Sequence, residues 1–457
     1  MIYSTRPEFK HFSCESEKVD SDPLFWKFKV IDPHIDSGLG ELLNLIGEYA
    51  IQERDISNRS YISGSSEITN LANFFESSSL PSDKEHLASL VVQKVRERTT
   101  YLSEEDIRET VEHGPLLEDY AFLIGRLKAY KQNPALLEQN SRFIFDPIKR
   151  RLDLYLGPDE HRLLAMSRVL GLIPFSAIER LRETKIRVMG ASVAASTIET
   201  LVALGAENIV FYDYGFLDPA KMPQMPGGMG DFRNSGEPKV KALMELVQGR
   251  NPYGIFLGIP GKVLIPGEAK QSEFDVYLDE IIDDADLLIE VVDQYHIKAG
   301  TRAHSDKPIV FVADLGSDPI AGIEDPKLNL WFNREISDED KARMSKIPAS
   351  REEAIREGPR AIYLMVNKDL NDDHRLQFLL ASLGLIPFWS QTPTSTRESA
   401  ALASKLIIEW TQNSPVMGKN IHPNESPKTL IEMFNAKTSL NLRRICAELL
   451  DIPPSII

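Results

Sequence analysis

The sequence predicts an α/β protein built on a doubly wound, mainly parallel sheet, with a mainly helical domain before it. Two observations predict this class. From about residue 180, short runs rich in Val, Ile and Phe alternate with helical patterns, and this alternation is typical of parallel strands joined by helices. Before residue 145, apolar residues recur at helical spacing in several segments instead.

The N-terminal portion, residues 1–145, is expected to form the helical domain. Helical spacing covers residues 39–55, 84–99 and 116–130. Serine clusters within residues 63–83 favour a loop between the first two helices, and the segment before residue 39 could hold strands. His34 lies in the run Asp-Pro-His-Ile-Asp, which we interpret as a turn rather than a metal site, because no further ligand cluster accompanies it.

Residues 146–415 are expected to form the sheet domain. Nearly continuous apolar runs predict strands buried on both faces, at residues 185–189, 208–213, 254–259, 286–293 and 308–314. Helices are predicted between them at 192–204, 237–250 and 296–304. Right-handed crossovers place the loops that follow such strands at one edge of the sheet, where these folds bind ligands.

A further helix is predicted at residues 394–413, where Ser395 and Glu398 have the spacing of a capping box and Leu402, Leu406 and Trp410 recur every four residues. Residues 416–457 are interpreted as a C-terminal extension with one short helix at 439–451.

Composition excludes several classes of protein. A formal net charge of −16 over 457 residues argues against binding a nucleic-acid polymer, which needs clustered Lys and Arg. No apolar run approaches the roughly 18 residues of a membrane span, and the first residues lack the pattern of a secretory signal, so we expect a cytoplasmic protein without membrane contact. Cys14 and Cys446 support neither a disulfide framework nor a structural zinc site.

The turn after the first predicted strand has the outline of a phosphate-binding turn. Gly190 opens the run Gly-Ala-Ser-Val-Ala-Ala, in the positions where Gly-x-Gly-x-x-Gly would stand. Glycines there allow the backbone to approach phosphates at a helix N-terminus. Ser192 and the alanines after it are small enough to permit such an approach, although an ordinary strand-to-helix turn explains the run equally well.

Asp213 follows at the end of the second predicted strand, close to the distance of ~20 residues at which an acidic residue accepts the ribose hydroxyls of a nucleotide. This position suits NAD and ATP equally well. A residue of a strand-end turn is the plainer interpretation.

The sequence downstream resembles the E1-like ThiF/MoeB superfamily of ubiquitin-activating-type enzymes, in its more divergent bacterial branch. A long loop is followed by a Gly-x-Pro-Lys helix start and an Asn-Pro step into the third strand, and the fourth strand ends in an Asp-Gln tip. The matching residues are Gly236, Pro238, Lys239, Asn251, Pro252, Asp293 and Gln294. The resemblance spans residues 145–415 and implies a Rossmann-like fold.

The resemblance implies that a carboxylate attacks the α-phosphate of ATP and becomes an acyl-adenylate. It implies that Lys239 offsets the negative charge of the phosphates, that Asp293 binds Mg²⁺ and that Asp213 binds the ribose. The reaction needs such positive charge beside the bond that breaks. Each residue also has a plainer interpretation: Lys239 as a surface lysine, Asp293 as a helix cap, and Asp213 as a turn residue.

The loop at residues 214–236 departs from the pattern of the superfamily. Lys221 falls near the position of an expected Asn, and Gln224 near that of an expected Arg. Glutamine cannot replace the bidentate phosphate clamp of arginine, so Arg233 is the candidate to compensate. A loop of this length is either a lid over the site or simply mobile.

The leading hypothesis is therefore an ATP-dependent adenylyltransferase with ATP and Mg²⁺ as cofactors. Its substrate is expected to be the C-terminal carboxylate of a peptide or small protein, and its active unit a homodimer. Neither cysteine lies in the resembling region, so transfer through a thioester has little support. The alternatives are a degenerate module that binds a peptide or partner enzyme, and an NAD-dependent dehydrogenase, for which we find no substrate domain.

Overall fold

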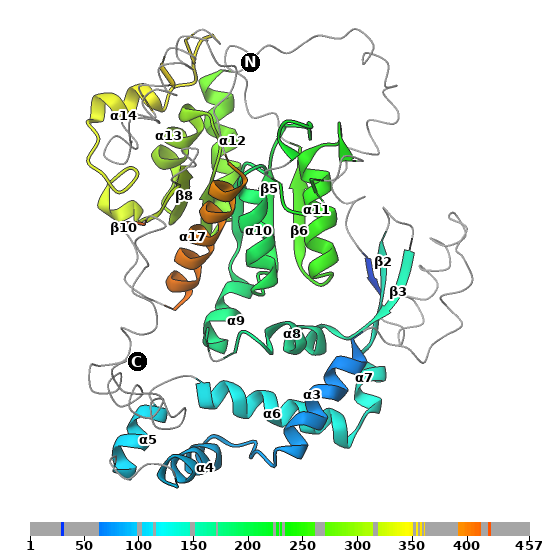
Figure 1. Cartoon of the computed structure of the whole chain (residues 1–457). Coiled ribbons are helices and arrows are strands. Elements are labelled where there is room, and N and C mark those ends of the chain that lie inside the picture. Colours follow the sequence, from blue (N-terminus) through cyan, green and yellow to red (C-terminus); the bar gives the residue numbers. More distant parts are fainter. Residues whose placement is uncertain are drawn as a thin grey trace. The chain divides into compact units, whose positions relative to one another are not determined.

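The computed structural model of the chain is shown in Figure 1. It describes residues 29–31, 64–97, 103–112, 116–146, 151–170, 172–222, 225–227, 229–230, 234–260, 270–313, 319–350, 353–354, 357–358, 361, 392–412 and 419–421. These form two compact units, one up to Glu179 and one from Arg180 onward, which we call the N-terminal unit and the sheet unit. The helices predicted at 39–55 and 439–451, and the run around His34, lie outside the described residues.

The sheet unit is built on a seven-stranded sheet with the order β10-β9-β8-β7-β4-β5-β6. Its strands are β4 (Ile186–Met189), β5 (Asn208–Tyr212), β6 (Ile255–Ile259), β7 (Leu287–Glu290), β8 (Ile309–Ala313), β9 (Ile320–Glu324) and β10 (Lys419–Ile421). The neighbouring strands β6, β5, β4, β7 and β8 are parallel to one another. At one side of the sheet, β9 pairs antiparallel with β8, and β10 pairs antiparallel with β9. The central strands β4 and β7 are buried throughout, as their continuous apolar runs predict.

Helices cover both faces of this sheet, as expected of right-handed crossovers. They are α10 (Ala194–Ala203), α11 (Lys239–Arg250), α12 (Gln271–Asp283), α13 (Tyr295–His304), α14 (Asp338–Met344) and α17 (Pro393–Thr411). α17 packs on α10. α12 and α13 share one apolar cluster with Met189 of β4 and Leu288 of β7.

Most predicted elements of the sheet unit agree with the structure to within about two residues. The cap of α17 differs, because Thr392 rather than Ser395 is the N-cap and its hydroxyl accepts the N–H of Ser395. Helices α12 and α14 and strands β9 and β10 were not predicted from the sequence.

The N-terminal unit combines helices with a small antiparallel sheet of order β1-β2-β3. Its strands are β1 (Lys29–Ile31), β2 (Arg142–Asp146) and β3 (Arg151–Tyr155). Its helices are α3 (Ser65–Ser77), α4 (Lys84–Arg96), α5 (Glu104–Glu112), α6 (Leu116–Gln132), α7 (Ala135–Asn140), α8 (Pro158–Met166) and α9 (Phe175–Glu183). The boundary between the two units falls within α9.

The serine-rich stretch at residues 63–83 was predicted as a loop, and this prediction is wrong. Its serines stand at the two ends of helix α3, whose interior carries Ile68, Ala72 and Phe75, all buried. Their spacing of four and three residues forms one apolar face, which packs against α6.

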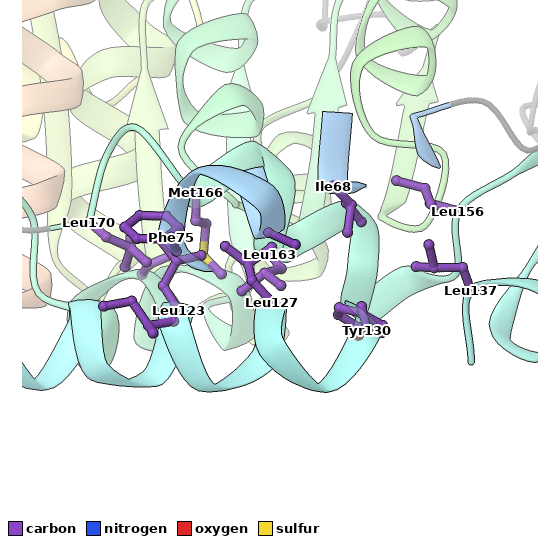
Figure 2. Packing of buried hydrophobic residues seen from close by; sticks show 13 residues of the cluster. Ile68, Phe75, Leu123, Leu127, Tyr130, Leu137, Leu156, Leu163, Met166 and Leu170 are labelled. Atoms are coloured by element: carbon purple, nitrogen blue, oxygen red, sulfur yellow. The ribbon is translucent and has the colours of Figure 1, made fainter. Parts of the chain in front are cut away.

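The core of the N-terminal unit is a cluster of 13 buried residues, shown from close by in Figure 2. Ile68 and Phe75 of α3 meet Leu123 and Leu127 of α6, and Leu163 of α8 lies beside them. Oε1 of the buried Glu160 accepts hydrogen bonds from Tyr130 Oη at 2.6 Å and Asn140 Nδ2 at 2.7 Å, which satisfies these buried polar groups, whereas no partner is found for Glu160 Oε2 in the described residues.

The doubly wound, mainly parallel α/β class with a mainly helical N-terminal region is thereby confirmed. The division into domains at residues 145 and 415 stays a proposal. Among the helices that the structure describes, none combines the length and apolar character needed to cross a membrane.

We expect Leu127→Ala to destabilise the protein by about 2–5 kcal/mol, because Leu127 is 1% exposed and its truncation leaves a cavity in the cluster of Figure 2. Urea unfolding of the full chain followed by circular dichroism measures this cost. The control is Phe74→Ala on α3, whose side chain is 62% exposed and whose loss should cost less than half as much. Equal costs for the two variants would contradict the packing described.

Candidate functional site

The candidate site lies where the direction of the sheet winding reverses. From β4 the chain builds β5 and β6 on one side, then crosses to β7 and β8 on the other. The carboxyl ends of β4 and β7 therefore border the crevice in which doubly wound sheets bind ligands. Gly190 follows β4 at this point with a φ of +98°. A Cβ at Gly190 would lie 3.2 Å from the carbonyl oxygen of Val291, so both conformation and space favour glycine.

The turn from Gly190 into helix α10 presents backbone donors at this edge. The N–H of Gly190 is bonded to the Tyr212 carbonyl at 2.9 Å, and that of Ala195 to the Ser192 carbonyl at 3.2 Å. Within the described part of the chain, no acceptor is found for the N–H groups of Ser192, Val193 and Ala194. Ser192 is partly exposed, whereas Ala191 and Ala194 are fully buried. Unpaired N–H groups at a helix N-terminus attract anions.

Asp213, which directly follows β5, ties this turn to the rest of the edge. Its Oδ2 accepts the N–H of Ala191 at 2.8 Å, and its Oδ1 accepts the N–H of Gly215 at 2.6 Å. The residue is 8% exposed. The buried Asp213 side chain therefore holds the turn in place through its hydrogen bond to Ala191. A carboxylate has about four lone-pair positions, so these two hydrogen bonds leave capacity for further donors, such as an ammonium and a ribose hydroxyl.

Lys239, the first residue of α11, meets the same carboxylate. Its Nζ lies 3.6 Å from Asp213 Oδ1, and its side chain is 8% exposed. A Cβ at Gly215 would lie 2.7 Å from Lys239 Nζ, so glycine at position 215 makes room for the ammonium. Lys239 is therefore not a surface lysine. The predicted residues Gly190, Asp213 and Lys239 converge as the sequence analysis expected.

A short antiparallel contact fixes the start of the loop at residues 214–236. Phe216 pairs with Pro238 in a β-bridge, and Leu217 N–H donates to the Glu237 carbonyl at 2.8 Å. At the end of the loop, Gly236 has a φ of +86°, and its N–H donates to the Leu217 carbonyl at 2.8 Å. This pairing brings the end of β5 and the start of α11 together, which is what places Lys239 against Asp213.

The other side of the site is the loop between β7 and α13. Asp293, the predicted metal ligand, is exposed on this loop. Gln294 next to it is the N-cap residue of α13, and its Nε2 donates to Tyr214 Oη at 3.0 Å. Tyr214 follows β5 and Gln294 follows β7, so this hydrogen bond spans the end of β4, the strand between them. It links the loops that carry Asp213 and Asp293.

The remaining predicted residues belong to the loop at residues 214–236. Lys221 is partly exposed, and its N–H is bonded to the Asp218 carbonyl at 3.0 Å. Within the described residues, no hydrogen bond or ion pair joins Lys221 to Asp213 or Lys239. Gln224 and Arg233 lie outside the described residues. Their roles stay proposals.

Sequence reasoning missed a buried charge network beside the site, formed by Glu290, Lys298, Arg302 and Glu324. Lys298 Nζ lies 2.8 Å from Glu290 Oε1, and Arg302 Nη1 lies 3.1 Å from Glu290 Oε2. Arg302 Nε donates to both oxygens of Glu324 at 3.0 Å. Burial raises the pKa of the Glu324 carboxyl, and the charge of Arg302 opposes that shift.

The network positions the loop that carries Asp293. Glu290 is the last residue of β7, and its Oε1 also accepts the N–H of Val292 at 3.1 Å. The same carboxylate therefore holds the loop and, through Lys298, the helix that follows it. Lys298 and Arg302 stand four residues apart on α13, on one face of the helix. This spacing after a strand ending in Glu290 was the signal available in the sequence.

The residues present fit the triphosphate of a nucleotide. Three unpaired N–H groups, a buried ammonium and a glycine with positive φ meet at one edge. No group of three His, Cys, Asp or Glu side chains that could hold a metal ion alone is found in the described residues. Magnesium at phosphate sites usually takes one or two carboxylates together with phosphate oxygens, so the single carboxylate of Asp293 fits this kind of site.

No protein-family model matches the chain, and no curated protein does. Among solved structures, the chain is similar to E. coli MccB with ATP at 12% identity and a TM-score of 0.39, covering 71% of this chain and 85% of that one. It is similar to E. coli MccB with AMPCPP and MccA at 12% identity and a TM-score of 0.38, covering 56% of this chain and 67% of that one. It is similar to PaaA at 12% identity and a TM-score of 0.37, covering 57% of this chain and 66% of that one.

The chain thus spans about two thirds of the MccB structure solved with AMPCPP and MccA.

We expect Glu290→Gln to destabilise the protein by about 3–5 kcal/mol, because it leaves the charges of Lys298 and Arg302 buried without their shared partner. Denaturant unfolding of the full chain provides the measurement. Glu183→Gln is the matched control, since that side chain is 71% exposed beside Arg182 and should contribute less than about 1 kcal/mol. A Glu290→Gln variant as stable as this control would show that the network does not hold the loop.

Proposed function

We propose that the protein binds ATP with Mg²⁺ at the carboxyl edge of its parallel sheet and activates a carboxylate as an acyl-adenylate. One observation carries the proposal: Asp213 joins the turn after Gly190 to Lys239, so that unpaired N–H groups and a buried cation gather at the point where the winding of the sheet reverses. The resemblance of the motifs at residues 236–252 and 293–294 to adenylating enzymes selects ATP over NAD.

In this proposal, each residue at the edge of the sheet has a separate role in binding ATP. The N–H groups of Ser192, Val193 and Ala194 and the ammonium of Lys239 would bind phosphate oxygens and offset the charge that builds up as the α-phosphate is attacked. Asp213 holds the turn and the Lys239 ammonium next to each other. Its carboxylate also has a lone pair left to accept a ribose hydroxyl. Asp293 would hold Mg²⁺, which supplies further charge neutralisation beside the scissile bond.

The substrate in this proposal is the C-terminal carboxylate of a peptide or small protein. Its oxygen attacks the α-phosphorus, the bond from that phosphorus to the bridging oxygen breaks, and pyrophosphate leaves. Arg233 and Gln224 are proposed as further phosphate contacts. A homodimer and a cytoplasmic location are retained as expectations from the sequence.

A degenerate module that binds a peptide without chemistry is the second candidate. The departures at Lys221 and Gln224 and the glycine-poor turn favour it. The two candidates differ in one outcome, since only an adenylating enzyme exchanges pyrophosphate into ATP.

We expect the purified full chain to bind ATP with Mg²⁺ in calorimetry and to catalyse ATP–pyrophosphate exchange with a panel of peptides that carry free C-termini. Lys239→Met should lower the exchange rate roughly 100-fold, as removal of one preorganised charge-stabilising group does. Lys239→Arg should restore part of it.

Lys241→Met is the matched control on the same helix, because Lys241 pairs with Glu237 at 3.6 Å and not with Asp213. Its exchange rate should equal that of the wild type. A folded Lys239→Met protein with undiminished exchange would refute the role of Lys239. Absence of both ATP binding and exchange in the wild type would refute the proposal.

We expect Asp293→Asn to raise the Mg²⁺ concentration for half-maximal exchange at least tenfold, a change of ~1.4 kcal/mol, because the amide lacks the negative charge that holds the cation. A Mg²⁺ titration at saturating ATP gives this value. Asp306→Asn serves as the comparison, since Asp306 is 81% exposed beside Lys307 and should leave the titration unchanged. An identical Mg²⁺ dependence in both variants would exclude Asp293 as the ligand.

A further inference from the structure

Tyr277 of helix α12 lies at the same edge of the sheet. α12 joins β6 to β7, which are both parallel to β4, and it ends just before β7 begins. The helix therefore runs back from the carboxyl edge, and side chains on a helix lean toward its N-terminus. The ring of Tyr277 stands edge-on to that of Tyr212, with ring centroids 6.4 Å apart and an interplanar angle of 84°. Tyr212 ends β5 and directly precedes Asp213.

The hydroxyl of Tyr277 is buried, and it is unpaired in the part of the chain that the structure describes. Leaving such a group unpaired costs about 1–3 kcal/mol. The ring itself packs against the apolar cluster of Met189, Leu288 and Val292, and phenylalanine would pack there equally well. Packing therefore explains the ring but not the hydroxyl.

The Tyr277 hydroxyl is protonated at neutral pH, as a phenol of ordinary pKa is. Burial is the main cause that raises the pKa of the Tyr277 phenol further, and the negative charge of Asp213 adds to that shift. At neutral pH the group is both a hydrogen-bond donor and an acceptor. The Tyr277 ring contacts that of Tyr212, the residue directly before Asp213.

We propose that Tyr212 and Tyr277 form the recognition surface for the heterocyclic base of the nucleotide, with the Tyr277 hydroxyl as the polar contact that selects the base. This inference rests on the proposed function, which places phosphates at the Gly190 turn and the ribose at Asp213. A base has flat apolar faces that suit aromatic side chains. Its edge carries ring nitrogens and exocyclic groups, which can pair with a hydroxyl that donates and accepts.

The test is Tyr277→Phe in the full chain, with calorimetric titration of ATP, GTP and inorganic tripolyphosphate in the presence of Mg²⁺. Loss of one neutral hydrogen bond should weaken ATP binding roughly three- to tenfold and reduce the preference for ATP over GTP. Tripolyphosphate has no base, so its affinity should not change. The Tm of the unliganded variant should equal or exceed that of the wild type, because no internal hydrogen bond is lost.

Tyr155→Phe on strand β3 is the matched control, since Tyr155 is also half-buried and its ring packs beside His161. This variant should bind all three ligands as the wild type does. Unchanged ATP affinity in Tyr277→Phe would overturn the inference while leaving the proposed function intact. Equal weakening of ATP and tripolyphosphate would also overturn it, because the effect would then not depend on the base. A wild type that binds no nucleotide would overturn both.

Discussion

The candidate site depends on the carboxylate of Asp213. One buried side chain bonds the turn after β4, the backbone just beyond β5, and the ammonium at the start of α11. Ala191 and the Lys239 side chain are buried, and an unpaired polar group there would be costly. Under the proposed function, the folding of this edge and the recognition of the ribose would share the same group.

The same arrangement occurs on both sides of β4. Asp213 directly follows the strand on one side, and Glu290 is the last residue of the strand on the other. Each carboxylate accepts the N–H two residues further along and contacts a lysine of the helix that follows, Lys239 or Lys298. Two acid–lysine pairs thus flank the Gly190 turn. The Arg302–Glu324 ion pair lies beside Lys298 and anchors the Glu290 side in the core. Among the described residues, Asp213 is the one anionic partner found for Lys239.

Much of the fold could be predicted because its signals are local. Continuous apolar runs mark β4 to β8, and the rules of parallel winding bring the ends of those strands together, which is why Gly190, Asp213 and Lys239 were expected to meet. The antiparallel strands β9 and β10 were missed because their pairing is a long-range choice that no local pattern encodes. Helix α3 was missed because serines at both ends obscured the apolar spacing of Ile68, Ala72 and Phe75.

The pairing of β10 with β9 has a consequence for how the chain is made. β9 ends at Glu324, and the strand that covers its outer side begins only at Lys419. On the ribosome, a nascent chain that has already released β9 must therefore wait for roughly a hundred further residues, many seconds of synthesis at typical rates. During that interval the backbone of β9 is open to other nascent strands, so nonsense truncation between the two would yield an aggregating product.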